Sequence, residues 1–174
     1  MQPIHFYLVL AFKMENSPID FEHSIAPWIG KTTKIVDHHM QEAMARHGLD
    51  LSKEQMIVLK KLMDEDGLNQ NELAALTYRD KSSLARLLSK MEQKKYIIRK
   101  QCREDRRINK VYLTEIGEKV FQQTRPLVRE LILKMEQNIS QEEKAIMIDI
   151  LKRVQANFVG HLDLVEEIRP WKGL

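Results

Sequence analysis

Helix-start signals recur along this chain of 174 residues and constrain its fold more than any other feature of the sequence. In three places a residue that caps helix N-termini stands three positions before a Glu or Gln, which can return a hydrogen bond to the cap. The three pairs are Ser52 and Gln55, Asn69 and Glu72, and Ser140 and Glu143. Apolar residues at helical spacing accompany each pair. With only six Gly and five Pro in the chain, these signals predict a mainly helical protein.

Three long segments near the ends of the chain carry an apolar stripe of helical period. They predict helices over Asp20–His47, Thr114–Asn138 and Ser140–Ile168. At a rise of about 1.5 Å per residue, the first helix alone would extend for roughly 40 Å, which is longer than a small core needs. We therefore expect these helices to cover their apolar stripes on a second copy of the chain.

The middle of the chain changes its period twice. A short helix is predicted over Gln70–Thr77, and a second helix, over Lys81–Lys94, begins after the N-cap Asp80. Residues 96–102 and 108–113 are rich in β-branched and aromatic side chains, and they flank a charged tip, so they predict a β-hairpin. This order predicts a winged helix-turn-helix, in which one helix enters the major groove of DNA and another supports it.

The charge of the chain is concentrated in this middle part. The whole chain carries a net charge of +3, but residues 79–110 hold twelve Lys or Arg against four Asp or Glu, a net +8, which leaves −5 for the rest. Such polarity favours an anionic partner for the basic part. The alternative is a solvated basic face without a partner.

Several classes of protein are disfavoured by what the sequence lacks. The single cysteine, Cys102, excludes an internal disulfide framework and a metal site built from several cysteines, and it fits a reducing compartment. No apolar run reaches the length of a membrane span. The chain has no glycine-rich phosphate loop and no recognisable catalytic constellation. We expect a cytoplasmic protein that is not an enzyme, needs no cofactor and does not bind membranes.

Four short motifs give the chain a resemblance to a known family. They are Asn71-Glu72-Leu73-Ala74, Asp80-Lys81-Ser82-Ser83-Leu84-Ala85-Arg86-Leu87-Leu88, Asp105-Arg106-Arg107 and Leu113-Thr114-Glu115-Ile116-Gly117. With them, the segment from about Asp20 to Phe158 resembles the multiple antibiotic resistance regulator (MarR) family. The resemblance implies a homodimeric winged-helix transcription regulator, in which the first and the last two helices form the dimer interface.

The resemblance also implies roles for particular residues. Asp105 would brace the wing through an arginine, and a wing arginine would reach into the minor groove; whether this is Arg106 or Arg107 stays open. The predicted DNA-binding residues are Lys81, Ser82, Ser83, Arg86, Lys90, Arg106 and Arg107. Two positions depart from the family pattern. Lys95 stands where a glycine is usual, so we expect a different turn there, because lysine disfavours a left-handed backbone. Cys102 stands where an acid is common.

Three sensor hypotheses stay open beside the DNA-binding one. Basic neighbours favour the thiolate of Cys102, so it is either a redox switch or a passive strand residue. His38 and His39 could bind zinc, although adjacent side chains on a helix point about 100° apart, and we predict no metal site. Trp28 either lines a pocket for a small aromatic acid, as the family's ligands suggest, or belongs to the core.

The predicted organisation is an N-terminal extension over residues 1–19, a dimerisation helix over 20–50, a winged helix-turn-helix head over 51–114 and C-terminal dimerisation helices over 115–174. The apolar residues 4–12 suggest either a frayed terminus or a segment docked in a groove. The predicted function is a homodimeric regulator, a repressor, that binds a pseudo-palindromic operator in double-stranded DNA and is released by a small aromatic ligand. The alternative is a winged-helix module that binds acidic proteins and has no specific DNA site.

Overall fold

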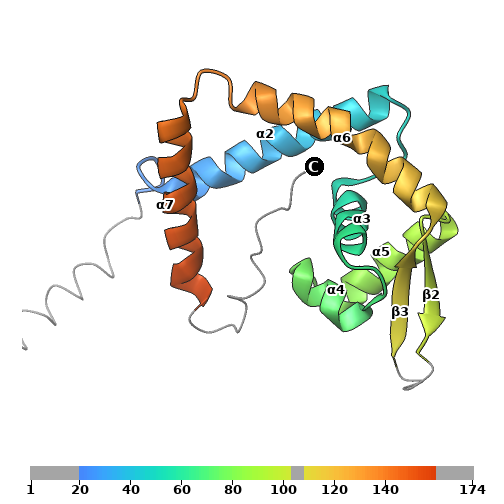
Figure 1. Ribbon diagram of the computed structural model, residues 1–174. Coiled ribbons are helices and arrows are strands. Elements are labelled where there is room, and N and C mark those ends of the chain that lie inside the picture. Colours follow the sequence, from blue (N-terminus) through green and yellow to red (C-terminus); the bar gives the residue numbers. More distant parts are fainter. Residues whose placement is uncertain (1–19, 103–107, 160–174) are drawn as a thin grey trace, which may run out of the picture. The chain divides into compact units, whose positions relative to one another are not determined.

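The computed structural model describes residues 20–102 and 108–159, and Figure 1 shows them as helices and one small sheet. In chain order the elements are α2 (Ile25–Arg46), α3 (Lys53–Asp64), β1 (Leu68–Asn69), α4 (Gln70–Leu76), α5 (Lys81–Gln93), β2 (Ile97–Gln101), β3 (Asn109–Leu113), α6 (Glu115–Met135) and α7 (Gln141–Val159). The predicted class, mainly α with a small β-hairpin wing, is confirmed. By its internal contacts the chain forms two units, and the boundary between them lies within α2, between Ile35 and Val36. No helix among the described residues is long and apolar enough to cross a membrane.

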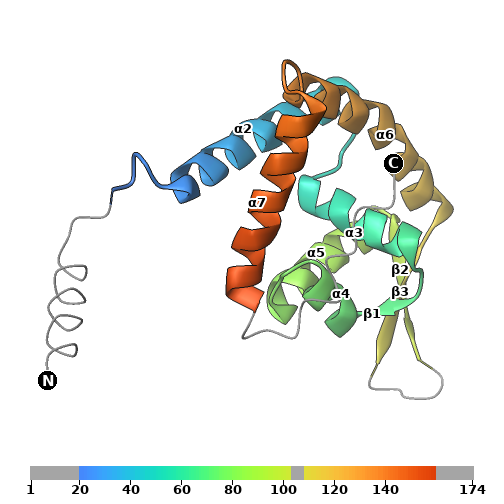
Figure 2. The same cartoon turned by 60° about the vertical axis from the view of Figure 1, so that its left-hand side comes forward.

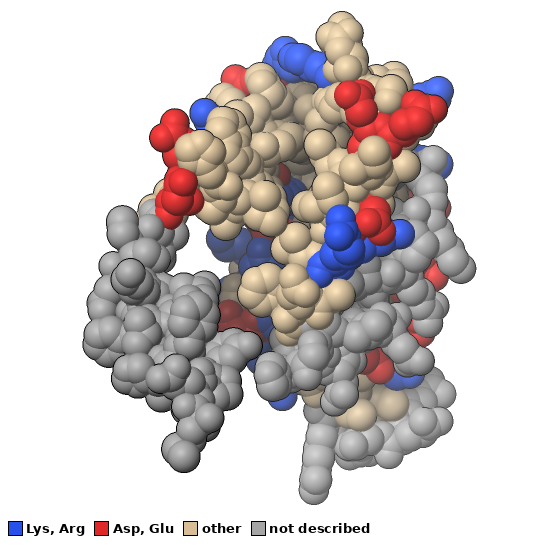
Figure 3. Space-filling model, turned by 90° about the vertical axis from the view of Figure 1, so that its left-hand side faces the viewer, with Lys and Arg blue, Asp and Glu red and all other residues tan. Residues whose placement is uncertain are grey.

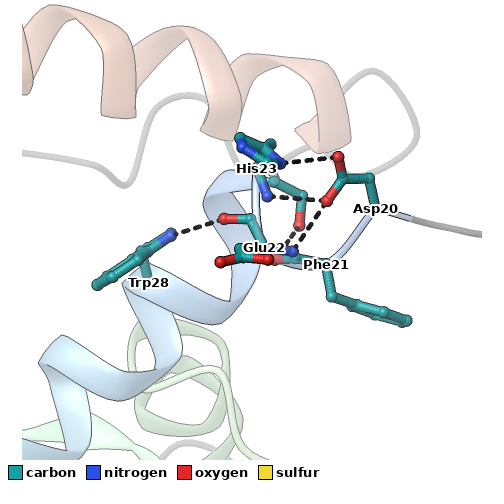
Figure 4. A network of polar contacts seen from close by, with 6 residues as sticks. Asp20, Phe21, Glu22, His23 and Trp28 are labelled. Atoms are coloured by element: carbon teal, nitrogen blue, oxygen red, sulfur yellow. Dashed lines mark hydrogen bonds and ion pairs between the residues drawn. The ribbon is translucent and has the colours of Figure 1, made fainter.

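The first described helix starts later than the predicted position, Asp20. The Oδ1 atom of Asp20 accepts hydrogen bonds from the backbone N–H groups of Glu22 and His23, both at 3.1 Å, and Oδ2 lies 2.8 Å from Nδ1 of His23 (Figure 4). Side-chain bonds of this kind offer the backbone an alternative to helical hydrogen bonds. Residues 21–23 therefore form a bend, and α2 begins at Ile25.

The three capping boxes are confirmed, and they fix where α3, α4 and α7 begin. Ser52 Oγ accepts the Gln55 N–H at 3.3 Å, while Gln55 Oε1 accepts the Ser52 N–H at 3.1 Å. The Asn69–Glu72 and Ser140–Glu143 pairs make the same reciprocal bonds. Each such cap contributes on the order of 1 kcal/mol to stability. These helix starts therefore follow from local sequence.

Three helix ends share one left-handed turn. At these three ends the left-handed residues are Gly48 (φ 67°), Tyr78 (51°) and Lys95 (61°). After each of them, the next N–H bonds back five residues, from Leu49 to Met44 O, from Arg79 to Ala74 O and from Tyr96 to Met91 O, each at 2.9 Å. This is the Schellman arrangement, in which glycine is the usual left-handed residue. The expectation that Lys95 changes its turn is wrong, because the backbone bonds of the turn and the burial of Tyr96 and Ile97 hold Lys95 in the left-handed region.

The small sheet has the strand order β1-β3-β2 and is antiparallel. β2 and β3 pair from Ile97 opposite Leu113 to Gln101 opposite Asn109, and they form the predicted hairpin (Figure 2). β1 adds Leu68 opposite Val111. β1 was not predicted, because a strand of two residues is too short to show a period of two.

One hydrophobic core joins the end of α2, α3, α4, α5, the sheet and α6 as far as Val128. Its fully buried large side chains are Met44, Leu59, Leu62, Leu73, Leu84, Leu88, Met91, Ile97, Val58 and Val111. Thr124 of α6 is also fully buried, and its hydroxyl donates to Phe121 O at 2.6 Å, so this polar group is satisfied within its own helix. The core therefore fixes α5 and the hairpin in one unit.

The apolar stripes of the C-terminal helices continue beyond this core. The last buried residue of α6 is Val128, and none of the described side chains of α7 is buried. The large apolar residues left exposed on α6 and α7 include Ile132, Leu133, Met135, Ile146, Met147, Ile148, Ile150, Leu151 and Phe158. Figure 3 shows that residues other than Lys, Arg, Asp and Glu make up most of the described surface in the upper part of its view. Within the described residues, nothing covers this surface.

The start of α6 depends on a close approach that leaves no room for a side chain. A Cβ atom at Gly117 would lie 2.1 Å from Tyr96 O, whereas one at Gly30, on an exposed turn of α2, meets nothing within 4 Å. We expect Gly117→Ala to lower the free energy of unfolding by about 1–3 kcal/mol. The control Gly30→Ala should raise it by about 0.5–1 kcal/mol, because alanine favours a helix. Denaturant unfolding measures both, and a Gly117→Ala variant as stable as the wild type would contradict the close approach.

Candidate nucleic-acid interface

The helix α5 separates its side chains into a buried and an exposed face. Leu84, Leu88 and Met91 are buried with at most 1% of their surface exposed, so they anchor the helix in the core. Because residues four apart lie on one side of a helix, Ser82, Arg86 and Lys90 share the opposite face. All three are exposed, and so is Lys81 in the first turn. The structure therefore brings three of the predicted DNA-binding residues together on one outward face, and it leaves a fourth, Lys81, exposed at the start of the helix. We call these four residues the α5 strip (Lys81, Ser82, Arg86 and Lys90).

Ser83, which was also predicted to bind DNA, is placed differently. It is half-buried, its N–H donates to the N-cap carboxylate of Asp80 at 2.8 Å, and its hydroxyl accepts a hydrogen bond from Arg79 Nη1 at 3.2 Å. Arg79 also lies 3.9 Å from Glu54 of α3. Ser83 and Arg79 thus connect the start of α5 to α3, and the DNA contact of Ser83 stays a prediction.

The wing is attached to α5 by an ion pair that the sequence analysis missed. Arg99 of β2 donates to the Glu92 carboxylate of α5 from its backbone N–H at 3.1 Å, from Nε at 3.0 Å and from Nη2 at 2.5 Å. Nη2 also reaches Ser89 Oγ at 3.4 Å. The hydrogen bonds from the Arg99 side chain hold the pKa of Glu92 below its ordinary value of 4.5. The only sign of this pair in the sequence is that Glu92 and Arg99 have opposite charges and stand seven positions apart, on either side of the predicted turn from helix to strand.

A second polar junction fixes the same, C-terminal end of α5. Lys94 Nζ lies 2.7 Å from the Asp50 carboxylate and donates to Asp50 O at 2.8 Å. The Tyr96 hydroxyl donates to the same carbonyl at 3.1 Å. The loop between α2 and α3 is therefore tied to the end of α5. No pattern in the sequence indicates contacts between residues more than forty positions apart.

These junctions change the interpretation of the basic segment. Arg79, Lys94 and Arg99 were counted in its net charge of +8, but each is paired with an acid, and each is less than a third exposed. They position α5, and the α5 strip carries the outward charge. Sequence spacing alone does not separate bracing cations from exposed ones.

The hairpin adds further basic residues. Lys100 of β2 stands directly opposite Lys110 of β3, and Lys100 Nζ lies 5.4 Å from the centroid of the Tyr112 ring. Like charges directly opposite each other destabilise a strand pair, so a phosphate beside them would relieve the repulsion. The predicted wing residues Asp105, Arg106 and Arg107 lie outside the described residues.

A cleft of about 940 Å³ lies beside the α5 strip. Its apolar wall includes Met44, Leu49 and Leu51, and its polar wall includes Ser82, Arg86 and Lys90. The cleft thus combines apolar surface, basic side chains of the strip and three carboxylates, those of Asp50, Glu54 and Asp80. Each of these carboxylates already has a partner, in Lys94, Arg79 and the Ser83 N–H respectively. The cleft could hold a small anion that has an apolar body.

Trp28, the predicted ligand-binding residue, does not line this cleft. Its side chain is 59% exposed, its indole N–H donates to Glu22 O at 3.2 Å (Figure 4), and Lys31 Nζ lies 5.7 Å from the centroid of its ring. The alternative that Trp28 belongs to the core of its own chain is therefore wrong, because the described residues leave most of its surface open. Its role in ligand binding stays a prediction.

The residues considered for metal and redox sensing are placed as follows. His38 Nε2 and His39 Nδ1 each lie 3.4 Å from the Glu42 carboxylate. Among the described residues, no group of three His, Cys, Asp or Glu side chains is arranged to hold a metal ion. Cys102 is a half-buried free thiol, and its backbone N–H donates to Ile108 O at 2.8 Å.

A supported helix with a basic outward strip, followed by a hairpin, defines a winged helix-turn-helix protein that binds DNA. A model of the MarR family matches residues 47–108. The HTH-type transcriptional regulator SarZ of Staphylococcus haemolyticus is 30% identical over 62% of this chain and 72% of its own length. The HTH-type transcriptional regulator YdgJ of Bacillus subtilis is 28% identical over 62% of this chain, which spans 65% of YdgJ, just under two thirds of its length.

The fold is also found in a solved structure. A mutant MarR from E. coli, complexed with operator DNA, superposes with a TM-score of 0.72 at 24% identity, over 79% of this chain and 99% of the other. The chain belongs to the MarR family of DNA-binding transcriptional regulators. The resemblance carried by the four motifs is confirmed.

The Glu92–Arg99 pair predicts an acid-sensitive attachment of the wing. Because the folded-state pKa of Glu92 lies below its ordinary 4.5, the pair stabilises the fold above that pH and loses its effect as the pH falls through the folded value. We expect Glu92→Gln to reduce the loss of stability between about pH 5 and pH 3, by no more than about 1 kcal/mol because the pair is partly exposed. Unfolding curves across this range measure it, with Glu130→Gln on α6 as control. Identical pH profiles for Glu92→Gln and the wild type would contradict the prediction.

Proposed function

We propose that this MarR-family protein is a homodimeric repressor that binds a pseudo-palindromic operator through the α5 strip. The observation that carries the proposal is the strip itself. Its four polar or cationic side chains are exposed, and three of them lie opposite the face of α5 that is buried in the core. Its role is regulatory and not catalytic. In this proposal it acts on chromosomal DNA in the cytoplasm.

Exposed apolar helix surface supports the dimer. Leu133 of α6 is 66% exposed, and Ile146 and Phe158 of α7 are 61% and 74% exposed. Contiguous apolar surface of this kind is typical of protein interfaces. In the part of α2 before Val36, Ile25 and Trp28 are likewise more than half exposed. We propose that residues 20–50 and 115–174 form the interface and that residues 51–114 form the DNA-binding head.

A dimer explains the proposed form of the operator. Two copies related by twofold symmetry present two reading helices, so their half-sites are inverted and lie about one helical turn apart. The wing contributes affinity beside each half-site, through Lys100 and Lys110 and through Arg106 or Arg107, one of which enters the minor groove. Asp105 braces the wing tip in this proposal.

The cleft supports release by a small aromatic acid. Its wall contains Ser82, Arg86 and Lys90, which also belong to the α5 strip, so a carboxylate bound there would compete with DNA phosphates for the same side chains. The apolar residues Met44, Leu49 and Leu51 would cover an aromatic ring. We also propose that Trp28 contacts the ligand. Binding of the ligand at Trp28 would change the spacing of the two DNA-binding heads in the dimer.

The dimer is tested by its mass. We expect light scattering at micromolar concentration to give twice the chain mass of 20.5 kDa. Replacing Leu133, an exposed apolar residue of α6, by Glu should shift the mass toward the monomer, because a buried charge in an interface is strongly unfavourable. Glu130→Gln, on the same helix, serves as control. A wild-type mass of 20.5 kDa would contradict the dimer.

DNA binding is tested by its salt dependence and by Arg86. If each subunit neutralises about three to five phosphates, log K against log salt should have a slope of about −5 to −9. Arg86→Ala should cost about 1–3 kcal/mol and weaken discrimination at one position of each half-site, because arginine reads guanine edges. By contrast, Arg107→Ala should weaken binding to all sequences evenly.

Arg125 is an exposed arginine of α6, and the variant Arg125→Ala serves as a control that removes the same charge outside the α5 strip. Full discrimination by Arg86→Ala would contradict the assignment of the reading residue. A flat salt response would favour the alternative, a module that binds acidic proteins. Repeating the assay with added aromatic acids tests the proposed release.

A further inference from the structure

Tyr78 adopts a backbone conformation that tyrosine disfavours. It has a φ of 51° in the turn between α4 and α5, where its own N–H bonds to Ala75 O at 3.0 Å and the N–H of Arg79 bonds to Ala74 O at 2.9 Å. Glycine or asparagine takes this left-handed position without the steric cost that a large side chain incurs. A strained residue of this kind is retained only where the surrounding structure holds it, and such residues gather at functional sites.

The side chain of Tyr78 is also largely exposed to solvent. At 67% exposure it is the most exposed large apolar residue described between residues 51 and 114, followed by Ile98 at 38%. Within the described part of the chain, its hydroxyl has no hydrogen-bond partner and its ring no aromatic or cationic contact. Packing therefore does not explain why this turn carries a tyrosine.

The position of Tyr78 relates it to the α5 strip. It stands two residues before the N-cap Asp80, at the same end of α5 as Lys81 and Ser82. The next side chain, Arg79, is turned to the protein by its contacts with Ser83 and Glu54. In a helix-turn-helix the N-terminal end of the second helix enters the major groove and the first helix crosses the backbone, so the turn between them passes the phosphates at the groove edge.

We infer that Tyr78 is a DNA-backbone contact, in which the phenol hydroxyl donates a hydrogen bond to a phosphate oxygen beside the groove entered by α5. Tyrosine is among the side chains that make such contacts, which set the register of a protein on the duplex without reading its sequence. The inference rests on the proposed function, because it requires that α5 enters the groove. It assigns a role to a turn residue that belongs neither to the α5 strip nor to the wing.

The experiment compares the full-length wild type with Tyr78→Phe, Tyr78→Gly and Lys95→Gly. Binding is measured by fluorescence anisotropy on a duplex that the wild type selects from a random library and on a scrambled duplex, and stability by thermal unfolding. Tyr78→Phe removes only the hydroxyl. Lys95→Gly is the matched control for strain, because Lys95 has the same turn at the other end of α5.

We expect Tyr78→Phe to keep the wild-type Tm and to bind both duplexes about 3- to 10-fold more weakly. Its salt slope should not change, since a neutral donor releases no counterion. Tyr78→Gly and Lys95→Gly should each raise the Tm by a few degrees through relief of strain. Tyr78→Gly should nevertheless bind DNA at least as weakly as Tyr78→Phe, whereas Lys95→Gly should stay within about twofold of the wild type.

Two results would overturn the contact while leaving the proposed function intact. One is wild-type affinity of Tyr78→Phe for both duplexes, whatever Tyr78→Gly does. The other is a loss confined to the selected duplex, which would make Tyr78 a base-reading residue. A wild-type protein that binds neither duplex would overturn the proposed function itself, and the contact with it.

Discussion

The burial of one stripe of α5 determines how the rest of the head is arranged. Leu84, Leu88 and Met91 have almost no exposed surface, and removing one such side chain typically costs about 2–5 kcal/mol. This anchoring fixes the rotation of the helix about its axis. Because the helical period is 3.6 residues, the same rotation turns Ser82, Arg86 and Lys90 outward. Core packing and the composition of the proposed DNA-binding surface are thus two consequences of a single constraint.

Polar junctions then fix the position of this helix along and across the head. Arg79 joins its start to α3, Lys94 joins its end to the loop before α3, and the Glu92–Arg99 pair joins it to the wing. Each pair is partly exposed and contributes little to stability by itself. Their effect is geometric, since they tie the helix that carries the strip to α3, to the loop before α3 and to β2 of the hairpin.

Strained backbone conformations occur at both ends of α5. Tyr78 and Lys95 both occupy left-handed positions where Gly48, at the end of α2, shows the usual residue. These two non-glycine turns lie at the start and the end of α5, the helix that we assign to DNA. Tyr78 is further distinguished by a ring and hydroxyl that are 67% exposed and have no partner among the described residues, which is the observation behind its proposed contact with DNA.

The sequence by itself determined the local features of this protein. Capping boxes such as Ser52–Gln55 and the N-cap Asp80 set the helix starts, and the change of period after Lys94 identified the hairpin, because these features depend on residues a few positions apart. The same patterns carried the family resemblance. Asp20 shows the limit of this reasoning. The helix was predicted to begin there, but the Asp20 side chain bonds the following N–H groups in a bend and α2 begins at Ile25.

Only the tertiary structure decided which residues of a type act together. It showed which cations of the basic segment form ion pairs within the protein and which are exposed. The sequence does not show this, because an ion pair such as Lys94–Asp50 joins positions that are distant in sequence. It added the strand β1, which pairs only because β3 is already in place. It also placed Trp28 at the surface, since the apolar stripe of a helix indicates that something covers it but not whether the cover comes from the same chain.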